Sequence, residues 1–258
     1  MMRRIQGLSD IAPDFAGMII DQFGVIHDGQ KLYPGAREAL ERLAAAGIKV
    51  VIVTNSGKRA RPNVERIVAM GIPRELFVDC ISSGELAYGS LEMRRAFIIG
   101  RRGDDYEFSG IEAVADPREA EVLLILGSNA PETSLEDYRE MLRGISLPCI
   151  CCNPDRWMLT ARGLQPAPGA IAQLYAEMGG TVTWIGKPYR GIYDAALALM
   201  GHPAPVLCIG DSAEHDVAGG RNAGLATLLV QQGVSADVAE ADLQPQPDYL
   251  LQAFRWAA

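Results

Sequence analysis

The chain of 258 residues lacks the features that mark membrane-spanning, secreted or nucleic-acid-binding proteins. No apolar run approaches the ~18 residues of a membrane span. No apolar segment follows the two arginines of the N-terminal sequence MMRRIQGLSD to form a signal peptide. No block of Lys or Arg is present, and 24 basic against 32 acidic residues give a net charge of −8, which disfavours contact with phosphate backbones. We expect a cytoplasmic protein that binds neither membrane nor nucleic acid.

Cysteine is scarce, with five residues in the chain, three of which fall in the segment CICC at 149–152. Such a cluster admits a metal site or disulfides. In a long chain without a secretory signal, however, closely spaced Cys in an apolar, strand-like run are typical of strand packing. We expect the cysteines to be reduced and structural. Low-complexity segments, internal repeats and a compositionally marked linker are also lacking.

What is present is an ordinary globular composition, 48% hydrophobic and 22% charged. Apolar runs typical of buried strands alternate with helical periodicity at both ends of the chain. This alternation predicts an α/β fold with a doubly wound, Rossmann-like parallel sheet. The expected strands are 16–20, 48–55, 181–187, 205–212 and 225–230, and the expected helices are 34–47, 61–71 and 190–201, with a Gly-rich turn or helix at 216–224.

The middle third has strand and helix patterns of its own. Strands are expected at 96–100, 121–127 and 148–152, and a helix at 134–145, where Ser134 and Asp137 form a variant of the capping box. We therefore predict a second, inserted α/β domain. The expected boundaries are 1–80 for the first part of the core, 81–179 for the insertion and 180–258 for the second part of the core.

Polar side chains follow three of the apolar strands at the point where each strand ends. Asp21 ends GMIID, Thr54 and Asn55 end VVIVTN, and Asp211 ends VLCIGD. Lys187 comes just after another apolar segment and before a helix. Because the carboxyl ends of parallel strands line the ligand crevice of an open sheet, we expect these residues to converge at one edge.

The charges of these residues indicate a chemistry. Two carboxylates from separate strands, here Asp21 and Asp211, would repel one another and any anionic substrate. A hard divalent cation such as Mg²⁺ removes that repulsion and commonly binds one or two carboxylates together with a substrate phosphate. The Thr54 hydroxyl and the Lys187 ammonium are suitable donors to phosphate oxygens. One carboxylate can then act as nucleophile and form an aspartyl-phosphate.

With these residues assembled, the chain resembles the haloacid dehalogenase (HAD) superfamily, in particular its NagD-like (subclass IIA) phosphatases. The four motifs of the family appear in order as DQFGVIHDG, VTN, GKPYRGIYDAAL and GDSAEHDVAGGRNAG. They anchor roughly the first 80 and the last 80 residues. In that subgroup an α/β cap, which closes over the site and selects the substrate, is inserted between the second and third motifs, as expected here.

The resemblance implies a role for each matching residue. Asp21 is the nucleophile and a metal ligand, the backbone carbonyl of Phe23 is a second ligand, and Asp211 is the ligand from the fourth motif. Asp216 orients Asp211 or a metal-bound water, and Lys187 neutralises the phosphoryl group. The expected function is Mg²⁺-dependent hydrolysis of a small phosphorylated metabolite, by an enzyme that forms a homodimer through its cap.

Thr54 and Asn55 are implied to bind the phosphoryl group. Asn153 and Asp155, in an Asn-Pro-Asp segment that resembles one of the subgroup, are taken as substrate-binding residues, although the same residues are also ordinary turn formers.

Phe23 departs from the family pattern. The phosphatases usually carry a second Asp at this position, which protonates the leaving group and later activates water. The backbone carbonyl survives the change, but the acid–base function does not. General acid–base catalysis contributes about 10²–10⁴-fold to the rate, or roughly 3–5 kcal/mol. We therefore expect weak activity on substrates with poor leaving groups.

Two alternatives remain. An aromatic residue at position 23 also resembles the metal-independent dehalogenases of the superfamily, but the retention of both Asp211 and Asp216 argues against that reading. The second alternative is a non-catalytic protein that binds a phosphate ligand, although a binder has no need of a nucleophile.

Other polar residues near these motifs have simpler readings. Asp28-Gly29 is typical of a hairpin turn. His27 is expected to be a solvated loop residue, with replacement of the missing acid as the alternative. His215 follows the expected metal ligand Asp211 in the same loop. Two roles remain open for it, an influence on the metal site and packing as a neutral side chain. Arg101 and Arg102 are expected in a solvated turn.

Overall fold

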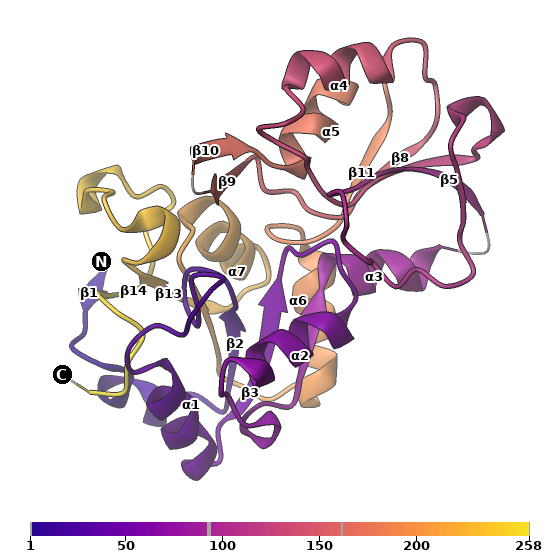
Figure 1. Cartoon of the computed structure of the whole chain (residues 1–258). Coiled ribbons are helices and arrows are strands. Elements are labelled where there is room, and N and C mark those ends of the chain that lie inside the picture. Colours follow the sequence, from indigo (N-terminus) through magenta and orange to yellow (C-terminus); the bar gives the residue numbers. More distant parts are fainter. Residues whose placement is uncertain (1, 92–93, 161, 258) are drawn as a thin grey trace. The chain divides into compact units, whose positions relative to one another are not determined.

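The computed structural model describes residues 2–91, 94–160 and 162–257. The chain divides into two compact units. Figure 1 shows the whole chain, coloured along the sequence from indigo at the N-terminus to yellow at the C-terminus. Unit 1 comprises Met1–Thr54, Arg61–Ile81 and Lys187–Ala258, and unit 2 comprises Asn55–Ala60 and Ser82–Gly186.

Unit 1 is built on a seven-stranded sheet with the order β1-β14-β13-β12-β2-β3-β4. The described strand pairings in this sheet are parallel. Apart from β1, which pairs with β14 at one edge, the chain order runs outward from β2 in both directions, as in a doubly wound sheet. The strands are β1 (Arg3–Arg4), β2 (Gly17–Asp21), β3 (Lys49–Thr54), β4 (Asp79–Ser82), β12 (Val206–Gly210), β13 (Ala226–Val230) and β14 (Tyr249–Leu251).

Helices cover both faces of this sheet. Met18 and Ile20 of β2 lie in one core cluster with the apolar face of α1, while Ile19, which points to the opposite face, is equally buried. Helix α6 packs on β2 and β3, and Figure 1 shows α1, α2 and α6 around these strands. Burial on both faces explains why β2 and β3 are continuous apolar runs. The helices are α1 (Ala36–Ala45), α2 (Ala60–Ala69), α6 (Arg190–Met200) and α7 (Ala218–Asn222).

Short helical turns complete unit 1. A π-helical turn, η5 (Ala213–Val217), leads from β12 into α7, in the region where the sequence predicted a Gly-rich turn or helix. The 3-10 turns are η1 (Leu8–Asp10), η2 (Ala12–Asp14), η3 (Arg74–Leu76), η6 (Gly233–Ser235) and η7 (Glu240–Asp242).

Unit 2 has a five-stranded parallel sheet of its own, with the order β11-β8-β7-β5-β6. Helix α4 begins at the predicted capping box, in which Ser134 and Asp137 each accept a hydrogen bond from the other's backbone N–H. Antiparallel strands β9 and β10 form a separate two-stranded sheet. The elements are β5 (Arg95–Ile99), β6 (Glu112–Val114), β7 (Val122–Ile125), β8 (Cys149–Cys151), β9 (Trp157–Thr160), β10 (Gly163–Pro166), β11 (Val182–Trp184), α3 (Ser83–Ser90), α4 (Leu135–Leu142), α5 (Pro168–Glu177) and the 3-10 turn η4 (Pro117–Glu119).

The strand predicted at 181–187 forms as β11, but it belongs to unit 2, whereas the sequence pattern predicts residues from 180 onward in the core. The reason is its partner: Val182–Trp184 pairs in parallel with Cys149–Cys151 of β8. The division between the units therefore falls between Gly186 and Lys187.

The five cysteines are buried and form no disulfide. Cys149 and Cys151 pack in the core of unit 2 with Tyr138 and Tyr175, which are side chains of α4 and α5. This agrees with strand packing as the role of the CICC segment. No helix within the described part of the chain is both long enough and apolar enough to cross a membrane.

Candidate active site

The carboxyl edge of the unit 1 sheet brings three buried carboxylates together. Asp21 is the last residue of β2, Asp211 directly follows β12, and Asp216 lies in the π-helical turn η5. One carboxylate oxygen of each lies within 4.8 Å of the others. Strands β2 and β12 are neighbours in the sheet, so their ends meet as the sequence predicted.

Lys187 is the cation of this cluster. Its Nζ lies 2.6 Å from Oδ1 of Asp21 and donates a hydrogen bond of 2.7 Å to Oδ1 of Asp216. The residue is only 4% exposed, so these two ion pairs are shielded from water. Lys187 thus fixes the relative positions of the carboxylates from β2 and η5.

The electrostatics of the cluster are dominated by burial and by the excess of negative charge. Burial raises the pKa of Asp21 to about 7; Lys187 opposes this rise and Asp216 adds to it. Burial, followed by Asp21 and Asp216, also raises the pKa of Asp211 well above its ordinary value. Burial lowers the pKa of Lys187, but the two carboxylates together outweigh it and raise the pKa. One ammonium therefore compensates three carboxylates incompletely.

Local backbone features hold Asp216 in place. The N–H of Ser212 donates to its Oδ2 at 3.1 Å. Gly210, at the end of β12, leaves room for the carboxylate, because a Cβ at that position would overlap it. With Lys187 on Oδ1 and Ser212 on Oδ2, both oxygens of Asp216 accept hydrogen bonds, which suits an orienting residue more than a direct metal ligand.

His215 belongs to the same turn. Its Nδ1 lies 3.1 Å from the Ser212 hydroxyl, and its backbone carbonyl accepts a hydrogen bond of 3.0 Å from Tyr193. These contacts fit the packing role, and they attach the turn to α6, which carries Tyr193.

Phe23 stands in the loop after β2. Its ring meets the His27 ring edge-on, with centroids 5.0 Å apart and an interplanar angle of 75°. It also lies against Gly29, since a Cβ on that residue would overlap the ring. The side chain is 47% exposed. An aromatic surface, held by its own loop, therefore occupies the position at which the family usually has an acid.

His27 does not lie in solvent, so the expectation of a solvated loop residue is wrong. The side chain is fully buried, and its Nδ1 accepts a hydrogen bond of 2.9 Å from the N–H of Gly29. Burial is the main cause that lowers the pKa of His27 to about 4. The local reason is the predicted turn at Asp28-Gly29, which folds back so that the N–H of Asp28 donates to the carbonyl of Lys31 at 3.1 Å.

The side-chain amide of Gln22 is the neighbour of the other ring nitrogen of His27, Nε2. Because Nδ1 accepts a hydrogen bond, a neutral ring carries its proton on Nε2, which lies 3.0 Å from the Gln22 amide nitrogen. The Gln22 Oε1 is buried without a hydrogen-bond partner among the described residues. Exchanging the amide oxygen and nitrogen pairs Nε2–H with Oε1 and satisfies both groups. His27 is therefore a structural residue of the first motif.

Thr54 and Asn55, adjacent in sequence, fall in different units. Thr54 ends β3 in unit 1 and is buried there. In unit 2, Asn55 donates from Nδ2 to Asp155 Oδ1 at 2.8 Å and accepts from the Ser83 hydroxyl at 3.2 Å. The N–H of Asp155 in turn donates to Asn153 Oδ1 at 3.0 Å. The structure thus brings together Asn55, Asn153 and Asp155, whose role in substrate binding stays a prediction.

The loop after β13 also reaches the carboxylate cluster, and no sequence motif described above predicts this. The N–H of Val234 donates to Oδ2 of Asp211 at 2.8 Å, and Gly233 lies against the same oxygen. The available signal was Gly233 soon after the apolar strand LATLLV, at the carboxyl edge where ligands bind.

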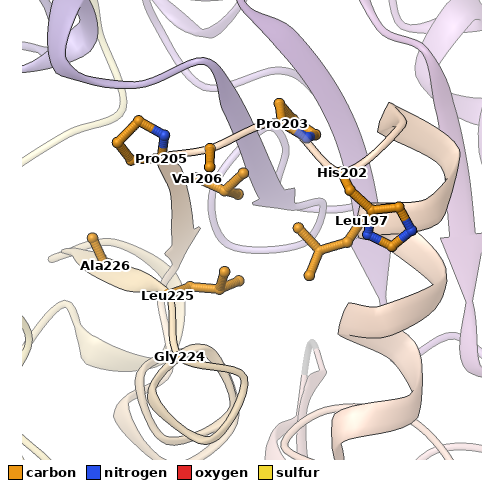
Figure 2. Close-up of a pocket in the computed structure, with 9 residues that line it drawn as sticks. Leu197, His202, Pro203, Pro205, Val206, Gly224, Leu225 and Ala226 are labelled. Atoms are coloured by element: carbon orange, nitrogen blue, oxygen red, sulfur yellow. The ribbon is translucent and has the colours of Figure 1, made fainter.

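A surface hollow of about 260 Å³ lies at the other end of the same sheet (Figure 2). Val206 and Ala226, which begin β12 and β13, line it together with Leu197 and Leu225. Apart from His202, the lining side chains are apolar. The hollow is therefore separate from the carboxylate cluster and brings no acid, base or nucleophile of its own beyond this histidine.

Comparison with known proteins agrees with this geometry. The family model of haloacid dehalogenase-like hydrolases matches residues 18–112, and a HAD-hydrolase-like model matches residues 184–257. The crystal structure of a haloacid dehalogenase-like hydrolase from Brucella suis 1330 is 30% identical, with 97% of this chain and 99% of that chain covered and a TM-score of 0.86.

Two phosphatases are similar over nearly the whole chain. The structure of p-nitrophenyl phosphatase from Archaeoglobus fulgidus is 28% identical, covers 93% of this chain and 96% of its own, and has a TM-score of 0.74. Sugar-phosphatase AraL from Bacillus subtilis (strain 168) is 28% identical, with 98% of this chain and 95% of that protein covered.

The chain therefore belongs to the haloacid dehalogenase-like hydrolases. Within them, the similarity to p-nitrophenyl and sugar phosphatases corresponds to the NagD-like phosphatase subgroup that the four motifs indicated. The prediction of a HAD-type hydrolase with a parallel α/β fold is confirmed.

Proposed function

We propose that this enzyme hydrolyses phosphate monoesters of small metabolites, with a divalent cation, Mg²⁺ in the first instance, and with Asp21 as nucleophile. The observation that carries the proposal is the meeting of Asp21, Asp211 and Asp216, whose carboxylate oxygens lie within 4.8 Å of one another. The Lys187 ammonium pairs with two of them, Asp21 and Asp216. The similarity to sugar and p-nitrophenyl phosphatases supports the substrate class.

The donor set suits a hard divalent cation. Carboxylate oxygens are the ligands that Mg²⁺ prefers, and three of them lie buried and close together. The incomplete compensation of their charge by Lys187 favours a further cation. Asp21, Asp211 and the backbone carbonyl of Phe23 would hold the ion. When bound, it neutralises the carboxylates and polarises the phosphoryl oxygens.

The protein groups account for the remaining chemistry. In the first step an oxygen of Asp21 bonds to phosphorus, and the bond from phosphorus to the leaving oxygen breaks, with the electron pair departing on that oxygen. Lys187 and Thr54 donate to the phosphoryl oxygens as their charge changes. In the second step water attacks the phosphorus of the aspartyl-phosphate and gives its proton to solvent. The bond from phosphorus to the Asp21 oxygen breaks, its electron pair returns to the carboxylate, and inorganic phosphate is released.

The residue at position 23 restricts which leaving groups the enzyme can release readily. A half-exposed phenyl ring cannot protonate a departing alkoxide. His27 offers no substitute, because it is fully buried and its Nδ1 is engaged by Gly29. We propose that turnover favours leaving groups of low basicity, such as phenolates. Alkyl phosphates should react more slowly than they would with a general acid at position 23, which contributes up to about 10²–10⁴-fold to the rate.

A substrate panel tests the proposal. The purified chain is assayed with p-nitrophenyl phosphate and with alkyl and sugar phosphates, each with Mg²⁺ and with a chelator. We expect aryl phosphate turnover that disappears with the chelator and in Asp21→Asn. The exposed Asp14→Asn is the matched control and should retain activity.

Other outcomes of the same panel would refute this function. Binding of phosphate esters with Mg²⁺ but no turnover would identify a non-catalytic binder. Chloride release from a 2-haloacid that the chelator leaves unchanged would identify a dehalogenase.

A further inference from the structure

Asp211 is enclosed by backbone from two loops that are far apart in sequence. Its Oδ2 accepts a hydrogen bond of 2.8 Å from the N–H of Val234. Gly24, in the loop after β2, and Gly233, in the loop after β13, lie against the same oxygen. A Cβ on either glycine would come well inside 3.0 Å of Oδ2, a separation that side chains essentially never adopt.

Backbone conformation adds a second reason for glycine at both positions. Gly24 has φ of +82° and Gly233 has φ of +52°, in the left-handed region that residues with a Cβ rarely occupy. The two loops can therefore approach the Asp211 carboxylate this closely only because residues 24 and 233 are glycines.

Each loop is anchored independently of Asp211. The N–H of Gly24 donates to the carbonyl of His27 at 3.0 Å. On the other side, the Gln232 Oε1 accepts a hydrogen bond of 3.0 Å from the N–H of Phe254, and the N–H of Gln231 donates to Leu251 at 2.8 Å. The groups that surround Oδ2 are thus fixed by the fold and not by the carboxylate.

We propose that Gly24, Gly233 and Val234 form a backbone clamp that positions Asp211 as a metal ligand. The clamp occupies Oδ2, prevents the carboxylate from rotating, and leaves Oδ1 as the oxygen for the cation. Gly24 also directly follows Phe23, whose carbonyl is the second proposed ligand, so one glycine sets the geometry of two ligands. This inference rests on the proposed function, because it assumes that Asp211 binds a cation.

Outer groups that orient a metal ligand typically change metal affinity by 10–100-fold when they are altered. Gly233→Ala should accordingly weaken Mg²⁺ binding by about 10–100-fold, measured by titration calorimetry and by the Mg²⁺-dependent rise in melting temperature. Turnover of p-nitrophenyl phosphate should recover at saturating Mg²⁺, since the clamp positions Asp211 and does not touch the substrate.

Gly224→Ala is the matched control. Gly224 also has a positive φ, +78°, but a Cβ there would meet nothing within 4 Å. This variant carries the same kind of backbone strain without pressing on a carboxylate, so its Mg²⁺ affinity should stay at the wild-type value. Equal weakening in both variants would show that strain alone is responsible and would overturn the clamp.

A second pair of variants tests the hydrogen bond if Gly233→Ala does not fold. Val234→Pro removes the N–H that reaches Asp211, whereas Val234→Ala keeps it and shortens a side chain that is mostly exposed. We expect weaker Mg²⁺ binding only in the proline variant. Wild-type affinity in Val234→Pro would overturn the clamp and leave the proposed function intact. No Mg²⁺ binding by the wild type would overturn both.

Discussion

Replacing Lys187 by methionine should destabilise unit 1 strongly. The methionine keeps most of the length of the side chain but removes the ammonium that pairs with Asp21 at 2.6 Å and with Asp216 at 2.7 Å. Because all three side chains are at least nine-tenths buried, water cannot take over the role of the ammonium. Two buried carboxylates are left without their cationic partner.

The size of the effect follows from this burial. Removing one partner of a buried ion pair costs about 3–5 kcal/mol, because the remaining charge is uncompensated. For a domain of roughly 150–250 residues, each kcal/mol shifts the melting temperature by about 2–4 °C. We therefore expect the melting temperature of Lys187→Met, in chelator, to fall by about 6–20 °C. The exposed Lys31→Met is the control and should shift it by less than about 2 °C.

A double variant separates charge from packing. Asp216→Asn removes one of the two carboxylates, so Lys187→Met combined with Asp216→Asn should be more stable than Lys187→Met alone, a non-additivity that identifies direct coupling. Added Mg²⁺ should raise the melting temperature of Lys187→Met more than that of the wild type, because the cation then replaces the lost positive charge.

Differential scanning fluorimetry with and without Mg²⁺ measures all of these shifts. A melting temperature of Lys187→Met within about 2 °C of the wild-type value corresponds to no more than ~1 kcal/mol and would refute a strong contribution of the buried ion pairs. A double variant less stable than Lys187→Met would refute direct coupling between Lys187 and Asp216.

Three further predictions concern the acid position, pH and the amide of Asn55. Phe23→Asp should raise turnover of alkyl phosphates by more than that of aryl phosphates, up to about 10²–10⁴-fold, since it restores a general acid; an equal gain on both would contradict the missing-acid argument. The Mg²⁺-induced rise in melting temperature should grow from pH 5 to pH 8. The pKa of Asp21 is raised to about 7, so between about pH 4 and 7 the folded protein binds more protons than the unfolded chain and its stability falls as the pH rises. Mg²⁺ competes with these protons, so its stabilising effect should increase as they dissociate. A rise in melting temperature that is the same at every pH would refute this. Asp155→Ala removes the acceptor of Asn55 Nδ2 and should raise KM by about tenfold, equivalent to ~1.4 kcal/mol, whereas Asp105→Ala on the surface of the same unit should leave the kinetics unchanged.

The pattern of apolar residues was sufficient to predict much of the fold. The continuous apolar runs that became β2, β3 and β12 reflect burial on both faces of a sheet, and α1 and α6 show the period of a half-buried helix. Asp21 ends its strand and Asp211 directly follows its strand, so a parallel topology predicts that both lie at the same edge of the sheet. These features are local in sequence.

Pairing across long separations could not be predicted in this way. Asn55 and Asp155 are 100 residues apart, and nothing in either segment indicates that their side chains form a hydrogen bond. The apolar pattern predicts a strand over 181–187, but the place of β11 beside β8 in unit 2 is a pairing between segments about 30 residues apart. Local periodicity reports that a residue is buried and does not report against what.

The order of amino acids is enough to predict the α/β elements, the four motifs and the acidic residues at the strand ends. Only the folded chain shows that His27 is buried, that Lys187 pairs with both Asp21 and Asp216, and that two loops enclose Asp211. This difference arises because secondary structure and strand-end position depend on neighbours along the chain. Burial, pKa and the hydrogen-bond partners of a side chain depend on whatever the completed fold places around it.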